Sequence, residues 1–179
     1  MMAPEVPLDN AQEEIAHHAE MAQERWIMYV ALTAAVLAVL AAIAALLAEH
    51  QATHAMMDQI QSSDKWSHYQ AKSIKANLLA TKIELLEGLG KGAGRADSEK
   101  RAEYAKDQEE IKHEAETLQA ESEARLHAHT VLSRSVTMFQ IGIAVGAISV
   151  LTRRKRFWFG SLAFGAAGAV FFVLGLLSG

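Results

Sequence analysis

The stretch EGLGKGAGRADSEK, residues 87–100, decides the fold because it holds the strongest helix-breaking cluster in the chain. Four glycines lie within seven residues: Gly88, Gly90, Gly92 and Gly94. Each one disfavours helix by about 1 kcal/mol relative to alanine. No glycine precedes Gly88, and none occurs between Gly94 and Gly142. The sequence therefore predicts two long helices joined by a glycine-rich tip at 88–96, with Asp97 or Ser98 as the N-cap of the second.

Three uncharged apolar runs flank this cluster. They cover residues 26–48, 136–152 and 157–177, about 23, 17 and 21 residues. The hydrocarbon core of a bilayer takes about 20 apolar residues of helix, with a lower limit near 17. We therefore expect three transmembrane helices over these ranges. The first run is too long for a signal peptide and follows an acidic segment, which indicates an uncleaved anchor.

The predicted extramembrane parts of the two long helices, 49–87 and 97–135, are nearly equal in length. At a rise of 1.5 Å per residue each arm would reach about 55–60 Å. Equal arms joined by a flexible tip predict an antiparallel helical hairpin over 49–135. The expected fold class is thus all-α: an integral membrane protein with three transmembrane helices and a long coiled-coil hairpin between the first and second.

Alternating steps of four and three residues trace a packing seam along each long helix. The first seam passes through Ala34, Ala38, Ala41, Ala45, Ala48, Ala52, Ala55, Gln59, Ser62, Trp66, Tyr69, Ser73, Ala76, Ala80, Ile83 and Glu87. The second passes through Tyr104, Ile111, Ala115, Leu118, Ser122, Arg125, Leu132, Phe139 and Gly146. Alanine is so common near the first apolar run that one register or another would fit by chance. The seams therefore indicate a direction of packing.

The composition of the chain excludes several classes of function. The chain is 51% hydrophobic, has a formal net charge of −4 and contains no cysteine, which rules out disulfides and thiolate chemistry. The acidic N-terminal segment, 1–25, holds six acidic residues against Arg25 alone and is typical of a surface helix or a disordered tail. The three apolar ranges contain no charged residue, whereas an ion-coupled pump needs an ionisable group in the membrane.

A run of four basic residues separates the second and third apolar ranges: Arg153, Arg154, Lys155 and Arg156. Short loops rich in Lys and Arg stay on the cytoplasmic side of a membrane. We therefore expect the N-terminus and this basic turn, 153–156, in the cytoplasm and the hairpin on the opposite side. Anionic lipid headgroups would surround the turn, with Trp158 as an interfacial anchor. Nucleic-acid binding is the weaker alternative, because no other segment forms a basic face.

Small residues mark faces on which membrane helices pack closely. In the first apolar range we expect Ala38 and Ala45 on such a face. Gly142 and Gly146 form a GxxxG pair in the second, and Gly165 belongs to a small-xxx-small pattern in the third. These patterns fit packing within one subunit and packing between subunits equally well.

Histidines offer the one metal hypothesis. His50 and His54 are four residues apart and share a helical face, and folding about the tip would bring His129 to the same level. Zn or Cu would accept such a ligand set. Solvated surface histidines are the alternative. We expect no cofactor and no catalytic residue, because the sequence holds no phosphate loop, HExxH motif or recognisable strand.

The stretch SSDKWSHYQAKSIK, residues 62–75, follows an alanine-rich run that begins with Trp26. Together they resemble a bacterial family of three-pass membrane proteins, domain-of-unknown-function family 4337, over the chain from about Gln23 to the third run. The resemblance implies a bacterial inner-membrane protein with a helical insertion between its first two spans, and it brings no activity. Trp66, Tyr69 and Lys72 share a helical face, either as a contact site for another subunit or as part of the hairpin core.

The sequence therefore favours a non-enzymatic inner-membrane protein that self-associates or serves as an accessory or scaffold subunit of a larger membrane complex. Its expected partners are membrane lipids and either further copies of the chain or other subunits, and no nucleic acid. An oligomeric channel or transport component is the first alternative, since small residues and backbone can line a pore. A metal-responsive module built on His50 and His54 is the second.

Overall fold

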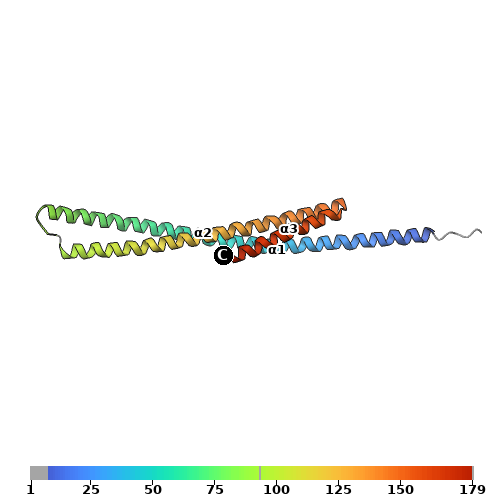
Figure 1. The fold of residues 1–179 in the computed structure, drawn as a ribbon, viewed down its shortest axis with the longest axis horizontal. Helices are drawn as coiled ribbons and strands as arrows, with labels where there is room; N and C mark the ends of the chain where they lie inside the picture. The colour runs from blue at the N-terminus through green and yellow to red at the C-terminus, as the bar shows by residue number, and fades with distance from the viewer. Residues whose placement is uncertain (1–7, 93, 179) are drawn as a thin grey trace, which may run out of the picture. The chain divides into compact units, whose positions relative to one another are not determined.

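The computed structural model describes residues 8–92 and 94–178, with side chains from Arg25 onward. These residues form three helices and no strand: α1 (Leu8–Gly88), α2 (Arg95–Thr152) and α3 (Lys155–Leu177) (Figure 1). The predicted all-α class is confirmed. By length and composition, all three helices are capable of crossing a membrane. Of the acidic N-terminal segment, residues 1–7 lie outside the described part, and 8–25 begin α1.

The end of α1 is fixed by Gly90. Its φ of 70° lies in the left-handed region, which a side chain with a Cβ adopts at a cost of about 1 kcal/mol or more. The N–H of Gly90 donates to the Glu87 carbonyl (3.0 Å), and the N–H of Lys91 donates to the Leu86 carbonyl (2.9 Å). This pair of bonds is a Schellman motif, which satisfies carbonyls that the last helical turn leaves free.

The start of α2 differs from the prediction by about three residues. The N–H groups of Asp97 and Ser98 both donate to the Gly94 carbonyl, at 2.9 and 3.3 Å, so the helix begins at Arg95 and not after Asp97. Asp97 therefore lies in the first turn, where its carboxylate favours the positive end of the helix dipole. Glycine is itself an accepted N-cap residue, and this is why the expected Asp or Ser is not needed.

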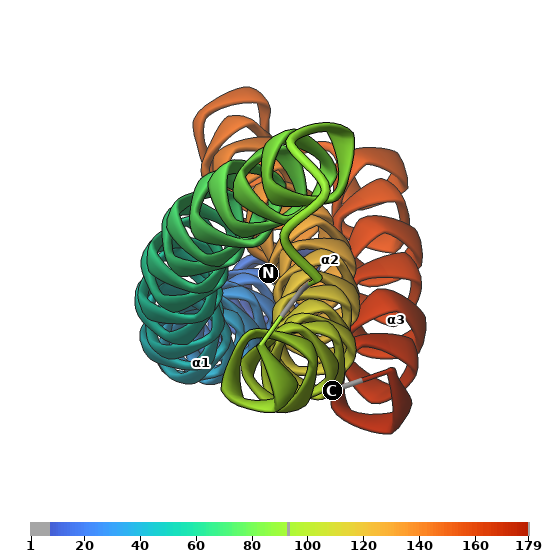
Figure 2. The ribbon, with the colours of Figure 1, turned by 90° about the vertical axis from the view of Figure 1, so that its left-hand side faces the viewer.

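The chain divides into two compact units. Unit 1 holds α1 up to Leu47 and the segment Val131–Leu177, and unit 2 holds Ala48–Thr130. Unit 1 thus contains α3 and the apolar parts of the two long helices, and unit 2 contains their polar parts and the glycine-rich tip. Figure 2 views the helices end-on and shows α3 lying beside α2.

The core of unit 1 is small and built on α1 and α2. Leu37, Ala41, Ala44 and Phe139 form its buried centre. Leu40, Val136, Ile143 and Phe172 pack against that centre. Because three of the central residues come from one face of α1, this face meets α2 and α3 along most of its apolar length.

In unit 2 the α1 and α2 segments lie side by side in opposite directions (Figure 1). Contacts pair early residues of one segment with late residues of the other: Ser62 meets Ala115, and Ala55 meets Ser122. The buried residues are mostly small: Ala48, Ala55, Ser62 and Ile83 from α1, and Ile111, Ala115, Ser122 and Ala128 from α2. Because few large apolar side chains are buried, unit 2 gains little hydrophobic stabilisation for its length.

The burial pattern tests the two predicted seams. Every position of the seam from Tyr104 to Gly146 is buried or half-buried in α2. In α1, Ala41, Ala48, Ala55 and Ser62 are buried as expected, but Ala38 and Ala45 are exposed. Two other predicted positions of this seam, Gln59 and Glu87, are exposed as well. Leu37 and Ala44 are buried in place of Ala38 and Ala45, because the large Leu37 side chain, and not an alanine, selects the face that meets α2 and α3.

Candidate functional site

Leu37 of α1 fits between two helices where glycines leave room. A Cβ added at Gly165 would lie 2.8 Å from Leu37 Cδ2, and one at Gly142 would lie 3.2 Å from Leu37 Cδ1. Gly146 is likewise close to α3, since its Cβ would lie 3.2 Å from Ser161 Oγ. The glycines that the sequence marks as packing positions thus hold α1, α2 and α3 together within one chain.

Two further glycines of α3 complete this packing and were not singled out in the sequence. A Cβ at Gly168 would lie 2.7 Å from the Phe139 ring, and one at Gly175 would lie 2.7 Å from Leu132. With Ser161 they form a series at intervals of seven residues. The series could have been found by the same heptad count that traces the α2 seam.

Polar side chains of unit 1 bond across its helices. Ser135 Oγ donates to the Gly168 carbonyl at 2.9 Å, and Trp158 Nε1 donates to Thr33 Oγ1 at 3.3 Å. Trp158, expected only as an interfacial anchor, is therefore half-buried and tied to α1. Interhelical bonds of this kind contribute about 0.6 kcal/mol on average inside membranes.

The basic turn is shorter than the four residues that define it in sequence. α2 ends at Thr152 and α3 begins at Lys155, so Lys155 and Arg156 occupy the first turn of α3. All four basic side chains are exposed. Arg153 has a φ of 52°, and the N–H groups of Arg153 and Arg154 donate to the carbonyls of Val150 and Ser149 at 3.3 Å. An arginine thus occupies a left-handed position that favours glycine.

Unit 2 is held by two reciprocal serine bonds. Ser62 Oγ donates to the Ala115 carbonyl at 2.9 Å, and Ser122 Oγ donates to the Ala55 carbonyl at 2.8 Å. On each helix the serine follows the alanine by seven residues, so each serine faces the other helix's alanine. Both serines are fully buried. The sequence analysis places both serines in the seams, but no sequence pattern indicates that their hydroxyls bond from one helix to the other.

Ion pairs flank this seam along its length. Lys65 pairs with Glu114, Lys72 with Asp107, Lys82 with Asp97, and Arg125 with Asp58. The first three lie partly in solvent, where a single pair contributes at most about 1 kcal/mol. Arg125 Nε and Asp58 Oδ2 are 2.9 Å apart without a well-aligned hydrogen bond, so their contact is electrostatic.

Lys72 has the most distinctive surroundings among these residues. Its ammonium hydrogen-bonds to Asp107 and lies 5.3 Å from the centre of the Tyr104 ring. The pKa of Lys72 is raised above its usual value, first by the hydrogen bond to Asp107 and also by the charges of nearby acidic groups, against a smaller opposing effect of burial. Lys72 therefore faces α2 within the chain.

Among the described residues, Trp66 and Tyr69, the other two of the predicted contact cluster, make no hydrogen bond or ion pair to α2 that resembles that of Lys72. The rings of Trp66 and Tyr69 meet edge to face, with centres 5.6 Å apart, and both side chains are half-buried. They line the edge of the α1–α2 seam. Part of each ring stays available to solvent or to another chain.

The structure separates the predicted metal ligands. His50 and His54 stack edge to face with ring centres 4.4 Å apart. His129 instead shares a hydrogen bond between Nδ1 and the Ala48 carbonyl (2.9 Å). Among the described residues, no three His, Asp or Glu side chains are grouped closely enough to hold a metal ion. His50 and His54 would thus supply two ligands at most from one helix face.

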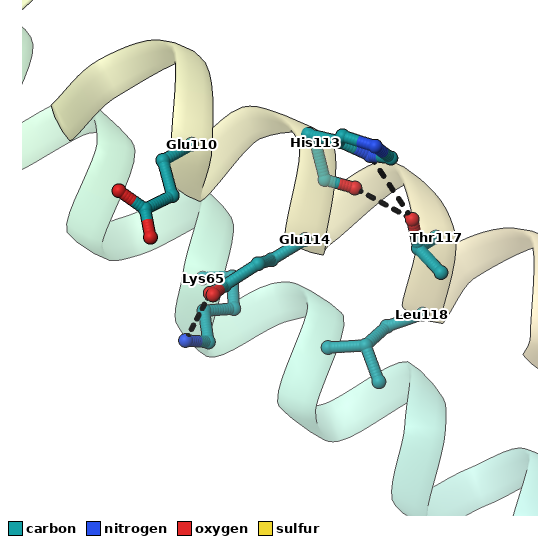
Figure 3. Close-up of a pocket in the computed structure, with 6 residues that line it drawn as sticks. All are labelled: Lys65, Glu110, His113, Glu114, Thr117 and Leu118. Atoms are coloured by element: carbon teal, nitrogen blue, oxygen red, sulfur yellow. Dashed lines mark hydrogen bonds and ion pairs between the residues drawn. The ribbon is translucent and has the colours of Figure 1, made fainter. Parts of the chain in front are cut away.

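A hollow of about 400 Å³ lies on the surface of unit 2 (Figure 3). It is lined by Lys65 of α1 and by Glu110, His113, Glu114, Thr117 and Leu118 of α2. Glu114 pairs with Lys65, and the Thr117 hydroxyl lies 3.2 Å from His113 Nδ1 and donates to the His113 carbonyl (Figure 3). The charges of Lys65 and Glu114 in the lining thus hold α1 and α2 together, and the hollow is open to water.

The family model described as "Domain of unknown function (DUF4337)" matches residues 26–178. The chain belongs to the DUF4337 family. No curated protein and no solved structure matches it. The DUF4337 match covers α1 from Trp26 onward and all of α2 and α3, so the stretch 62–75 and most of both units fall inside the family's domain.

Proposed function

We propose that this protein is a scaffold that acts by self-association in the inner membrane of a bacterium. The observation that carries the proposal is a stripe of exposed alanines on α1 in unit 1, spaced alternately by four and three residues: Ala31, Ala35, Ala38, Ala42 and Ala45. We call it the alanine stripe. It includes both alanines that the sequence marks as packing positions.

The alanine stripe stays exposed, whereas four glycines of α2 and α3 are packed within the chain. Leu37 covers Gly142 and Gly165, Phe139 covers Gly168, and Leu132 covers Gly175. Larger side chains border the stripe on one side, where Val39 and Leu46 are 60% and 69% exposed. In lipid, helices associate through close van der Waals packing of small residues, and an exposed face of alanines allows a second helix to approach closely.

Resonance energy transfer between labelled copies in liposomes tests this proposal. The double variant Ala38→Leu/Ala42→Leu should lose most of the transfer, because two leucines push the helices apart. The control variant Val39→Leu/Ile43→Leu changes exposed neighbours off the stripe and should keep it. A wild-type protein that shows no transfer at any lipid dilution would sink the proposal.

We further propose that unit 2 is an antiparallel hairpin of the coiled-coil kind on the periplasmic side, with the N-terminus and the basic turn in the cytoplasm. The reciprocal serine bonds and the heptad spacing support the hairpin. The four exposed basic side chains at the turn from α2 into α3 support the orientation.

Single cysteines at Gly92 and Lys155 report the orientation, since the chain has no cysteine of its own. An impermeant thiol reagent added to intact cells with a permeabilised outer membrane should label position 92 and leave position 155 unlabelled. Labelling at 155 alone would invert the orientation.

A further inference from the structure

α1 carries a second apolar face in unit 2, on the side away from α2. Ile74, Leu78 and Leu85 are 61%, 67% and 64% exposed, and Ile60 and Met57 are more than half exposed. At 100° per residue these five side chains lie opposite Ser62 and the rest of the seam with α2. We call them the outward stripe.

The outward stripe belongs to a water-facing part of the helix. Lys75 and Lys82 of α1 border it, and Asp64 lies on the same face between Ile60 and Ile74. An apolar stripe of this length among charged neighbours is a feature of contact surfaces in water. Over residues 57–85 it extends for about 42 Å of helix.

Charge distinguishes the two helical segments of unit 2. The α1 part, residues 49–88, holds five acidic and four basic side chains, whereas the α2 part, 95–130, holds ten acidic and six basic. Two copies that approached through α2 would meet with like charge, and this costs free energy. Two copies that approach through α1 meet with nearly balanced charge and apolar side chains.

We propose that the outward stripe is the water-exposed contact with a second copy of this chain, in a parallel and in-register arrangement. The proposal rests on self-association as the proposed function and names its surface. Copies inserted in one membrane share one orientation, so their α1 helices run in the same direction. In register, each apolar residue of the outward stripe meets its own counterpart, which makes the surface self-complementary.

The flanks of the outward stripe fit this arrangement. In a parallel pair, a residue on one flank faces the residue five positions later on the other helix. Gln70 then faces Lys75 of the second copy, and Asn77 faces Lys82. Each contact joins an amide oxygen to an ammonium group, and Lys82 keeps a donor for it beside its two bonds to Asp97. No flanking pair brings two like charges together.

One residue limits the contact. Asp64 lies in the outward stripe between Ile60 and Ser67, and in register it faces a second Asp64. This layer opposes pairing, so the close contact runs from Ala71 to Leu85, beyond it. In this part Ala71, Ile74, Leu78, Thr81 and Leu85 follow the alternating three- and four-residue steps of coiled-coil layers, with Thr81 as the one polar member.

Single-cysteine variants of the full-length protein in liposomes test the arrangement. With a mild oxidant, Leu78→Cys and Leu85→Cys should each form a disulfide-linked dimer, because in-register positions approach to disulfide distance. The control Ala105→Cys is also exposed but lies on α2, away from the outward stripe of α1, and should stay monomeric. A Leu78→Glu/Leu85→Glu variant should lose resonance energy transfer, and Ala105→Glu should keep it.

The outcomes separate this inference from the proposed function. If Leu78→Cys and Leu85→Cys form no dimer while wild-type copies still show energy transfer, the outward stripe is not the interface, and self-association stands. If wild-type copies show no transfer, both fall. Disulfides between Ile60→Cys and Leu85→Cys copies, in place of like with like, would overturn the parallel arrangement. The cysteine variants remain decisive if the glutamate variant fails to fold.

Discussion

At the scale of single residues, the close approach of helices in unit 1 depends on glycines, which carry a hydrogen atom where other residues carry a Cβ. Gly168 faces the buried Phe139 ring, and Gly175 faces Leu132. In both cases the added carbon would meet the neighbour at 2.7 Å, well inside van der Waals contact. The neighbour or the helix must move, and in a packed core such movement costs about 1–3 kcal/mol.

Gly168→Ala should therefore lower the thermal stability of the detergent-solubilised protein. The matched control is Gly160→Ala, where the added Cβ meets Val145 Cγ1 at an ordinary 3.5 Å. Both changes gain about 1 kcal/mol of helix propensity, so the difference between them reports packing alone. Thermal unfolding followed by circular dichroism measures it. Equal melting temperatures would show that α3 does not rest on Phe139.

Gly90 and Arg153 occupy the same left-handed position at the ends of α1 and α2, and only Gly90 suits it. Arg153→Gly should raise stability by about 1 kcal/mol, because the strain of a Cβ at positive φ disappears. Gly90→Ala should lower it by a similar amount. Denaturant unfolding of both variants checks the pair of opposite signs, and a fall in stability for Arg153→Gly would contradict it.

At the scale of elements, the α1–α2 pair of unit 2 depends on polar contacts as much as on apolar ones. The replacement Ser62→Val/Ser122→Val removes two buried hydroxyls and adds bulk where the helices are close. Each lost bond costs about 1 kcal/mol, and overpacking adds to this. Ser67→Val is the control, since its hydroxyl is exposed and bonds to the Ser63 carbonyl of its own helix. Hydrogen exchange at 50–62 and 115–125 should rise only in the double variant.

Lys72 gives the same pair of helices a dependence on alkaline pH. Its pKa is raised in the folded protein, so its stabilising effect is complete below about 10.5, the value for free lysine, and is lost as pH rises through the folded pKa. Lys72→Met should be less stable than wild type at pH 8, and the difference should shrink above pH 11. Melting temperatures across this range test the sign. A constant difference would mean that the methionine acts through packing.

At the scale of the whole molecule, the antiparallel register of unit 2 is open to a direct chemical test. Ser62→Cys combined with Ala115→Cys should form an intramolecular disulfide, because the Ser62 side chain already meets the Ala115 backbone. Ser62→Cys with Ala105→Cys is displaced by ten residues, about 15 Å, and should form none. Gel mobility with and without reductant distinguishes the two. A disulfide in the displaced pair alone would contradict the register.

The sequence predicted much of this molecule because its strongest signals are local. The glycines from Gly88 to Gly94 mark the connection between the long helices, and the apolar runs mark three helices able to cross a membrane. The α2 seam was correct because large residues such as Phe139 fix its phase. The phase of α1 was partly wrong at Ala38 and Ala45, since alanines occupy every side of that helix and only Leu37 distinguishes one of them.

The contacts across the helices were beyond what the sequence alone conveys. The bonds of Ser62 and Ser122 depend on a backbone separation that no residue pattern states. The same holds for Trp158, whose bond to Thr33 joins residues 125 positions apart. The contact of His129 was equally unpredictable, because its ring shares a hydrogen bond with the Ala48 carbonyl and does not join His50 and His54.

The glycine-rich tip has a practical use. A Cβ at Gly88, Gly90 or Gly92 would meet no other atom within 4 Å, so the connection between α1 and α2 borders open space. A fluorescent protein or an affinity epitope spliced in at Gly92 would thus avoid every packed surface of the chain. Such fusions would allow the molecule to be followed in living cells by light microscopy and recovered gently with whatever accompanies it.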